Sequence, residues 1–126
     1  MRVYLPGRIG IPVYSSLLPG EKTVDVRRVT AADLARSATP GSEPPAQLDA
    51  IARTLWFAKA GRWDEAHDLC QDLPDPSGAW LHAWLHREEG DLSNAAYWYA
   101  RARQPIPAKN LSLADEWDQI ARALLD

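Results

Sequence analysis

Three histidines are the strongest candidates for a chemical site in this 126-residue chain. His82, His86 and Glu89 follow one another at intervals of four and three residues. At about 100° per residue, a helix places them within roughly 60° of one another on one face. His67 precedes them by one predicted helix, and antiparallel packing of the two helices would bring it alongside. Three imidazoles and a carboxylate form a donor set that satisfies tetrahedral zinc.

The same histidines also have a structural interpretation, which the sequence favours. The run from His82 to His86 lacks the glutamate beside the first histidine that zinc hydrolases use as a base. Partly buried histidines that form hydrogen bonds between helices need no metal. The structural interpretation, which we adopt from the sequence, includes no metal and no organic cofactor. Metal binding or acid–base chemistry at His67, His82, His86 and Glu89 is the alternative.

Other residues with catalytic potential form weaker patterns. Cys70 falls on the apolar side of its predicted helix, where a thiol is buried and inert, although a dyad with His67 is geometrically possible. Adjacent carboxylates such as Glu88 and Glu89 diverge on a helix and are typical of a solvated surface. Neither a G-x-G-x-x-G nor a G-K-[ST] phosphate loop occurs in the sequence. The chain is therefore more consistent with a binding protein than with an enzyme.

Composition limits the class of protein. A net charge of −3 argues against a nucleic-acid binder, which usually carries a basic excess. No apolar run approaches the roughly 18–20 residues that a membrane span needs. A single cysteine fits a reducing compartment. These features predict a soluble cytoplasmic protein that binds neither nucleic acid nor membrane.

Helices must position the histidines, because apolar residues recur at helical spacing almost throughout residues 46–126. Gly61 and Gly90 are placed to end two of these helices in the left-handed conformation. Loops of two to eight residues between the helices make neighbours antiparallel. The expected helices span about 46–60, 62–73, 77–89, 92–104 and 113–125.

Residues 1–45 differ in composition and are predicted to form an irregular N-terminal arm. They hold six of the ten prolines and four of the seven glycines, which exclude long helices. Thr30-Ala-Ala-Asp33 is a capping-box pattern that predicts one short helix to about Ala38, and residues 23–29 carry a weak strand signal. Apolar side chains such as Val3 and Leu5 indicate that the arm packs against the helical-hairpin domain, residues 46–126.

An internal repeat relates two of the predicted turns. The segments 61–66 and 90–95 each contain a glycine followed five residues later by an alanine, and they lie 29 residues apart. Gly90-Asp91, Ala95, Tyr99, Ala102 and Pro107 fall at the spacings of a second tetratricopeptide helix, which the chain resembles despite that family's period of about 34 residues. The resemblance implies an all-α fold of two stacked helical hairpins with a C-terminal capping helix.

A second resemblance covers the segment from Trp80 to Tyr99. It is similar to a family of small uncharacterised microbial proteins that share the pattern HA-x-L-HR-x-EGD-x-x-NA-x-YWY. That family brings no assigned activity, so this resemblance implies kinship without a reaction.

The tetratricopeptide register also implies where a partner would bind. This register places a groove on the concave side of the hairpins, and the groove is too apolar to remain exposed to solvent on a monomer. The sequence therefore predicts an interaction or scaffold module that binds a peptide, a partner protein or a second copy of itself, with the N-terminal arm as the nearest cover. His82 and His86 then point into the packing between helices. The residues predicted to line this groove are Trp80, Trp84, Arg87, Glu88, Leu48, Ile51 and Leu55.

Overall fold

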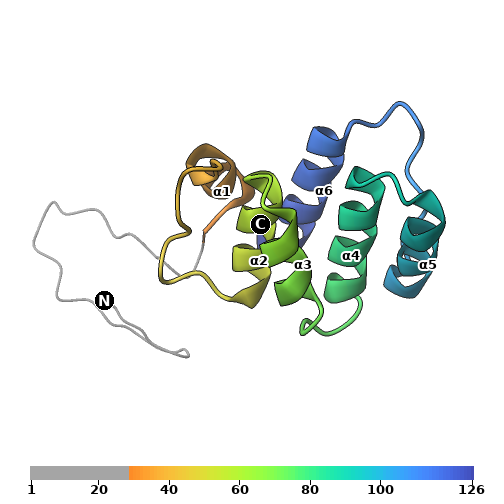
Figure 1. The fold of residues 1–126 in the computed structure, drawn as a ribbon, viewed down its shortest axis with the longest axis horizontal. Coiled ribbons are helices and arrows are strands. Elements are labelled where there is room, and N and C mark those ends of the chain that lie inside the picture. The colour runs from red at the N-terminus through yellow and green to blue at the C-terminus, as the bar shows by residue number, and fades with distance from the viewer. Residues whose placement is uncertain (1–28) are drawn as a thin grey trace, which may run out of the picture.

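The computed structural model describes residues 29–126, and this part of the chain is all-α (Figure 1). The helices expected after residue 45 are present, and the short helix predicted after Thr30 is α1. None of the helices in residues 29–126 is long and apolar enough to cross a bilayer. The apolar part of the arm and nearly all of the predicted strand, residues 1–28, lie outside the described residues. The helices are α1 (Ala31–Ser37), α2 (Ala50–Lys59), α3 (Trp63–Cys70), α4 (Ser77–Glu88), α5 (Leu92–Ala102) and α6 (Leu113–Leu125).

Capping side chains and glycines set the helix boundaries. Thr30 Oγ1 accepts a hydrogen bond from the Asp33 backbone N–H, and the Asp33 carboxylate accepts one from the Thr30 N–H, as the capping box predicts. Gly61 and Gly90 follow α2 and α4 with φ of 79° and 89°, a region that glycine adopts without steric cost. At the end of α5, Arg103 takes the left-handed conformation with φ of 58°. The sequence did not predict this conformation.

The helices after α1 form two antiparallel hairpins and a closing helix (Figure 1). α2 packs on α3, α3 on α4, and α4 on α5, while α6 contacts both α2 and α4. The expected all-α architecture of two hairpins with a C-terminal helix is confirmed, whereas the tetratricopeptide assignment itself stays a prediction.

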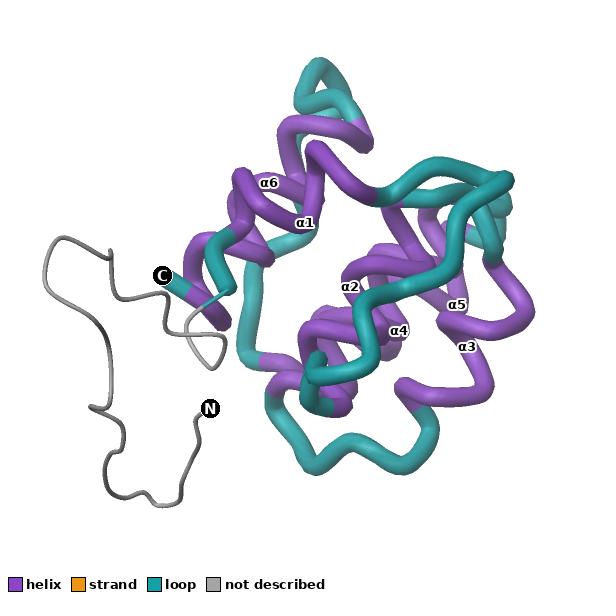
Figure 2. The backbone as a smooth tube through the Cα atoms, turned by 90° about the vertical axis from the view of Figure 1, so that its left-hand side faces the viewer, coloured by secondary structure: helices purple, strands orange, loops and turns teal. Residues whose placement is uncertain are grey.

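α1 belongs to the same hydrophobic core as the hairpins. Leu34 is only 1% exposed, and the Trp56 Nε1–H of α2 donates a hydrogen bond of 2.9 Å to Ser37 Oγ. Figure 2 shows α1 lying against α6, and the Ala31 backbone N–H donates to the Asp126 side chain at 3.0 Å. The boundary predicted at residue 45 therefore separates α1 from helices that it packs against.

The apolar groove predicted on α2 and α4 is filled by α6. Leu55 is fully buried, and the Trp117 Nε1–H of α6 donates to its carbonyl at 3.0 Å. Trp84 is 4% exposed, and its Nε1–H donates to the Leu113 carbonyl at 2.9 Å. Because α6 carries its own apolar face, with Ile120 fully buried, it covers this surface. The surface that was expected to need cover from the N-terminal arm, a partner or a second copy is therefore covered by α6.

The other residues predicted to line the groove pack in the core, form an ion pair or are exposed singly. Leu48 is buried, while Ile51 and Trp80 are half-buried and pack against the core. Arg87 forms an ion pair with a residue of α6, and Glu88 is exposed. No continuous binding surface remains at the positions that the sequence singled out.

Candidate functional site

The three histidines gather where α3, α4 and α5 lie side by side, with α4 between the other two. These two flanking helices both pack on α4, and within the described fold they do not contact each other. His82 and His86 lie one turn apart on α4, and His67 comes from α3. Trp63 of α3 and Trp98 of α5 stand on either side of them. We call these five side chains the histidine cluster.

The imidazole rings are close to one another, as the antiparallel register of α3 and α4 predicts. The ring centres of His82 and His86 are 6.0 Å apart and their planes are nearly parallel. The His67 ring stands edge-on to both, at 5.0 Å from His82 and 5.5 Å from His86. All the histidines of the chain therefore meet at one place.

Two tryptophans hold these rings in position. Trp63 lies one turn before His67 and stacks on it at 4.6 Å, and its Nε1–H donates to the Leu85 carbonyl of α4 at 2.8 Å. Trp98 stacks on His82 with 4.0 Å between ring centres. Consecutive residues of a helix send their side chains in different directions, but the run Tyr97-Trp98-Tyr99 does not by itself indicate these stacking partners.

Burial keeps the His82 ring neutral. The residue is 6% exposed, and this desolvation, followed by the nearby rings of His67 and His86, lowers its pKa to about 4. A neutral imidazole has one N–H, and its other ring nitrogen carries a lone pair.

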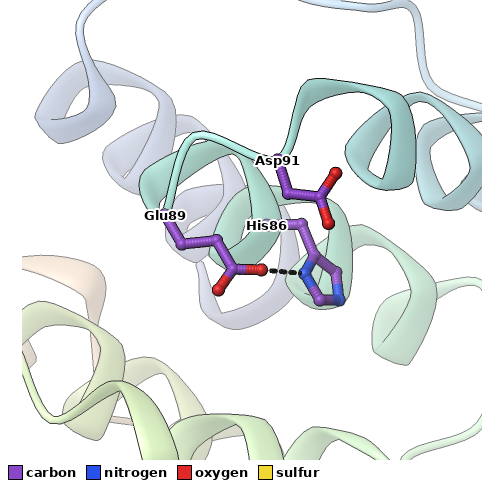
Figure 3. Close-up of side chains that lie close together, drawn as sticks. All are labelled: His86, Glu89 and Asp91. Atoms are coloured by element: carbon purple, nitrogen blue, oxygen red, sulfur yellow. Dashed lines mark hydrogen bonds and ion pairs between the residues drawn. The ribbon is translucent and has the colours of Figure 1, made fainter.

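His86 is oriented by a carboxylate. Its Nδ1 lies 2.7 Å from Glu89 Oε2, and Figure 3 shows this bond with Asp91 approaching the same ring from the following turn. When Nδ1–H donates to Glu89, Nε2 on the far side of the ring carries the lone pair. Histidines that bind metals are held in this way, with the second nitrogen donating to a carboxylate or a carbonyl.

The spacing of the rings matches a tetrahedral metal centre. With Zn–N bonds of about 2.0–2.1 Å, the centres of two coordinated imidazoles lie roughly 5 Å apart. The three observed separations, 5.0, 5.5 and 6.0 Å, are close to that value. The three imidazoles are not a donor set whose ligand atoms lie within 4.8 Å of one another. Coordination therefore requires the rings of His67 and His82 to turn about their second side-chain torsion, out of their stacks with Trp63 and Trp98.

A second donor set shares His86. Among the described residues, His86, Glu89 and Asp91 are the one group of three whose ligand atoms all lie within 4.8 Å of one another (Figure 3). Asp91 also caps α5 by accepting the Asn94 backbone N–H at 3.3 Å. Both carboxylates are exposed, and exposed acidic groups commonly lie close together without holding a metal ion. We therefore assign Glu89 the role of orienting His86.

The possible Cys70–His67 dyad does not form. The Cys70 thiol donates to the His67 backbone carbonyl at 3.4 Å and makes no hydrogen bond to its ring. Burial, and to a lesser extent the charge of Asp68, raises the pKa of this thiol to about 12. At neutral pH the thiolate that nucleophilic catalysis needs is therefore not populated.

A buried polar network on α4, α5 and α6 was only partly predicted. Arg87, which the tetratricopeptide register placed in the groove, pairs with Glu116 at 2.9 Å and also donates to the Leu111 carbonyl. The Tyr99 hydroxyl donates to Glu116 at 2.5 Å, and burial and that carboxylate raise the pKa of Tyr99. The sequence offered one indication that Glu116 is buried, which is its position one residue before Trp117 in the apolar stripe of α6.

The chain was compared with known proteins on three levels. It matches no family model, no curated protein and no solved structure. The two resemblances therefore stay predictions.

Proposed function

We propose that this helical domain binds a divalent transition-metal ion through the imidazoles of His67, His82 and His86. The observation that carries the proposal is that all three histidines of the chain, from two helices, lie together with ring centres 5.0 to 6.0 Å apart. Histidines used only to fill an interface have no need to meet one another.

The protonation state of the cluster supports this assignment. Metal ions bind the neutral imidazole, and protons compete with them. His82 is neutral at pH 7 because its pKa is about 4. When the His86 Nδ1–H donates to Glu89, Nε2 of that ring carries a lone pair. A metal ion therefore does not have to displace a proton from His82 at pH 7.

The donor type restricts the identity of the ion. Imidazole suits zinc, copper and nickel, whereas magnesium and calcium prefer oxygen ligands. Three protein ligands leave a fourth position of a tetrahedral ion for water or another ligand, which is the pattern of catalytic zinc sites. The geometry supports binding of a borderline metal and does not identify a reaction.

The interaction function predicted from the sequence has less support. It depended on an exposed apolar groove lined by Trp84 and Leu55, and α6 now buries both side chains. Binding of a peptide or of a second copy stays a prediction, and another surface would have to perform it.

Calorimetric titration of the untagged chain with Zn²⁺ tests the metal proposal. We expect one ion per chain, and at least tenfold weaker binding in each of the variants His67→Gln, His82→Gln and His86→Gln. Asp68→Asn is the matched control, because it changes an exposed side chain beside His67. Circular dichroism of each variant verifies its helical content.

Two results would overturn the three-histidine site. One is the absence of saturable zinc binding by the folded wild-type chain. The other is binding that Glu89→Gln abolishes while His67→Gln and His82→Gln leave it unchanged, which would assign the ion to His86, Glu89 and Asp91.

A further inference from the structure

A second candidate site lies on a different face of α5 from the one that carries Trp98. A cavity of about 400 Å³ opens between α4, α5 and the connection that leads to α6. Its walls are apolar and include Leu92, Ala96, Tyr99, Ile106 and Leu113. This volume is at the lower end of the range for small-molecule sites, roughly 300–1,000 Å³.

The mouth of the cavity exposes aliphatic surface. Leu92 and Ile106 are each 65% exposed, the highest values among the large apolar side chains of the described residues. Leu92 starts α5 and Ile106 lies in the following connection, so two separate segments present apolar side chains to one opening. A ligand with an alkyl body would cover both, and their burial would stabilise its complex.

The charged side chains at the cavity are both cationic. Arg87 and Lys109 line it, and no lining residue is acidic. Arg87 is already neutralised by Glu116, whose side chain is 3% exposed behind the wall, and it also donates to the Leu111 carbonyl. Lys109 has no ion-pair partner among the described residues, so its charge is available to an anion.

We propose that this cavity binds a small aliphatic monocarboxylate, with the alkyl chain against Leu92, Ala96 and Ile106 and the carboxylate at Lys109. The apolar walls supply most of the binding free energy, and the cation selects the anionic form over a neutral analogue. This inference is independent of the metal proposal, since the histidine cluster contributes no residue to the cavity.

Calorimetric titration of the full chain with octanoate, in EDTA to remove metals, tests this inference, with 1-octanol as the neutral analogue of equal chain length. We expect one octanoate per chain and at least tenfold weaker binding of 1-octanol. Lys109→Gln should weaken octanoate about tenfold and leave 1-octanol unchanged. Arg122→Gln removes the same charge from an exposed position on α6 and should change neither affinity.

Two further variants test the apolar walls. Ala96→Phe fills the cavity and should abolish binding of both compounds. Leu92→Gln, at an exposed position that tolerates substitution, should weaken both about fivefold with helical content retained. The inference is overturned if the wild-type chain shows no saturable heat with octanoate. It is also overturned if 1-octanol binds as tightly, or if neither Lys109→Gln nor Leu92→Gln alters octanoate binding.

Discussion

Burial of the neutral His82 ring should make the folded state less stable as the pH falls from 7 to 5. In the unfolded chain this histidine takes up a proton near pH 6.5, whereas in the folded state its pKa is about 4. Between these values the unfolded state binds more protons, so the free energy of unfolding rises with pH in that window. The stabilisation is complete above pH 6.5 and is lost as the pH approaches 4.

The two pKa values set the magnitude. Proton linkage at one site gives a loss of about 2 kcal/mol between pH 7 and pH 5 for a folded pKa of about 4. The groups that face His82 are His67 on α3, His86 on α4 and Arg101 on α5. A charge on His82 would meet the fixed charge of Arg101, and at lower pH any charge on the other two histidines.

Urea unfolding followed by circular dichroism at pH 7, 6 and 5, in EDTA, measures this dependence. His82→Gln is the matched variant, because glutamine retains a polar side chain that does not titrate. We expect less than half of the wild-type dependence in this variant. An equal dependence in both proteins, or none in the wild type, would show that His82 is not the buried neutral group described here.

Three further predictions concern the fold. Glu116→Gln should destabilise the chain by about 3 kcal/mol in urea unfolding, because it breaks a buried ion pair, while Asp118→Asn at an exposed pair should change it by less than about 0.5 kcal/mol. Gly90→Ala should cost about 1 kcal/mol through its positive φ, whereas Gly41→Ala, with open space around it and no positive φ, should leave the melting temperature unchanged. Leu34→Ala should cost about 3 kcal/mol, and a melting temperature equal to that of the wild type would exclude α1 from the core.

The helices could be predicted from the sequence because their signals are local. Apolar periodicity, the capping box at Thr30 and the glycines after α2 and α4 act over a few residues, and the structure confirms them. The left-handed Arg103 at the end of α5 was missed, because arginine rarely adopts that conformation.

The packing of the helices could be predicted only in part. Periodicity defines the apolar face of α6 but not the surface that this face covers, so the groove was expected to be covered by the N-terminal arm, a partner or a second copy. Local residues likewise predicted α1 without showing that Leu34 enters the core. Glu116 was overlooked because a carboxylate in an amphipathic helix is usually solvated.

The candidate site combines a signal that sequence carries with one that it does not. The interval between His82 and His86 places both on one face of a helix, and the hairpin register brings His67 to them. The stacking of Trp63 and Trp98 depends on side-chain orientation across three helices, and spacing alone does not determine it.

Nuclear magnetic resonance of the imidazole groups tests the central claim most directly, because the three histidines of the chain all lie in the cluster. Zn²⁺ is added stepwise to the ¹⁵N-labelled, untagged protein at pH 7. The account predicts that the ring nitrogen signals of His67, His82 and His86 shift together and saturate at one equivalent. Shifts confined to His86, or three rings unchanged at excess zinc, would contradict it.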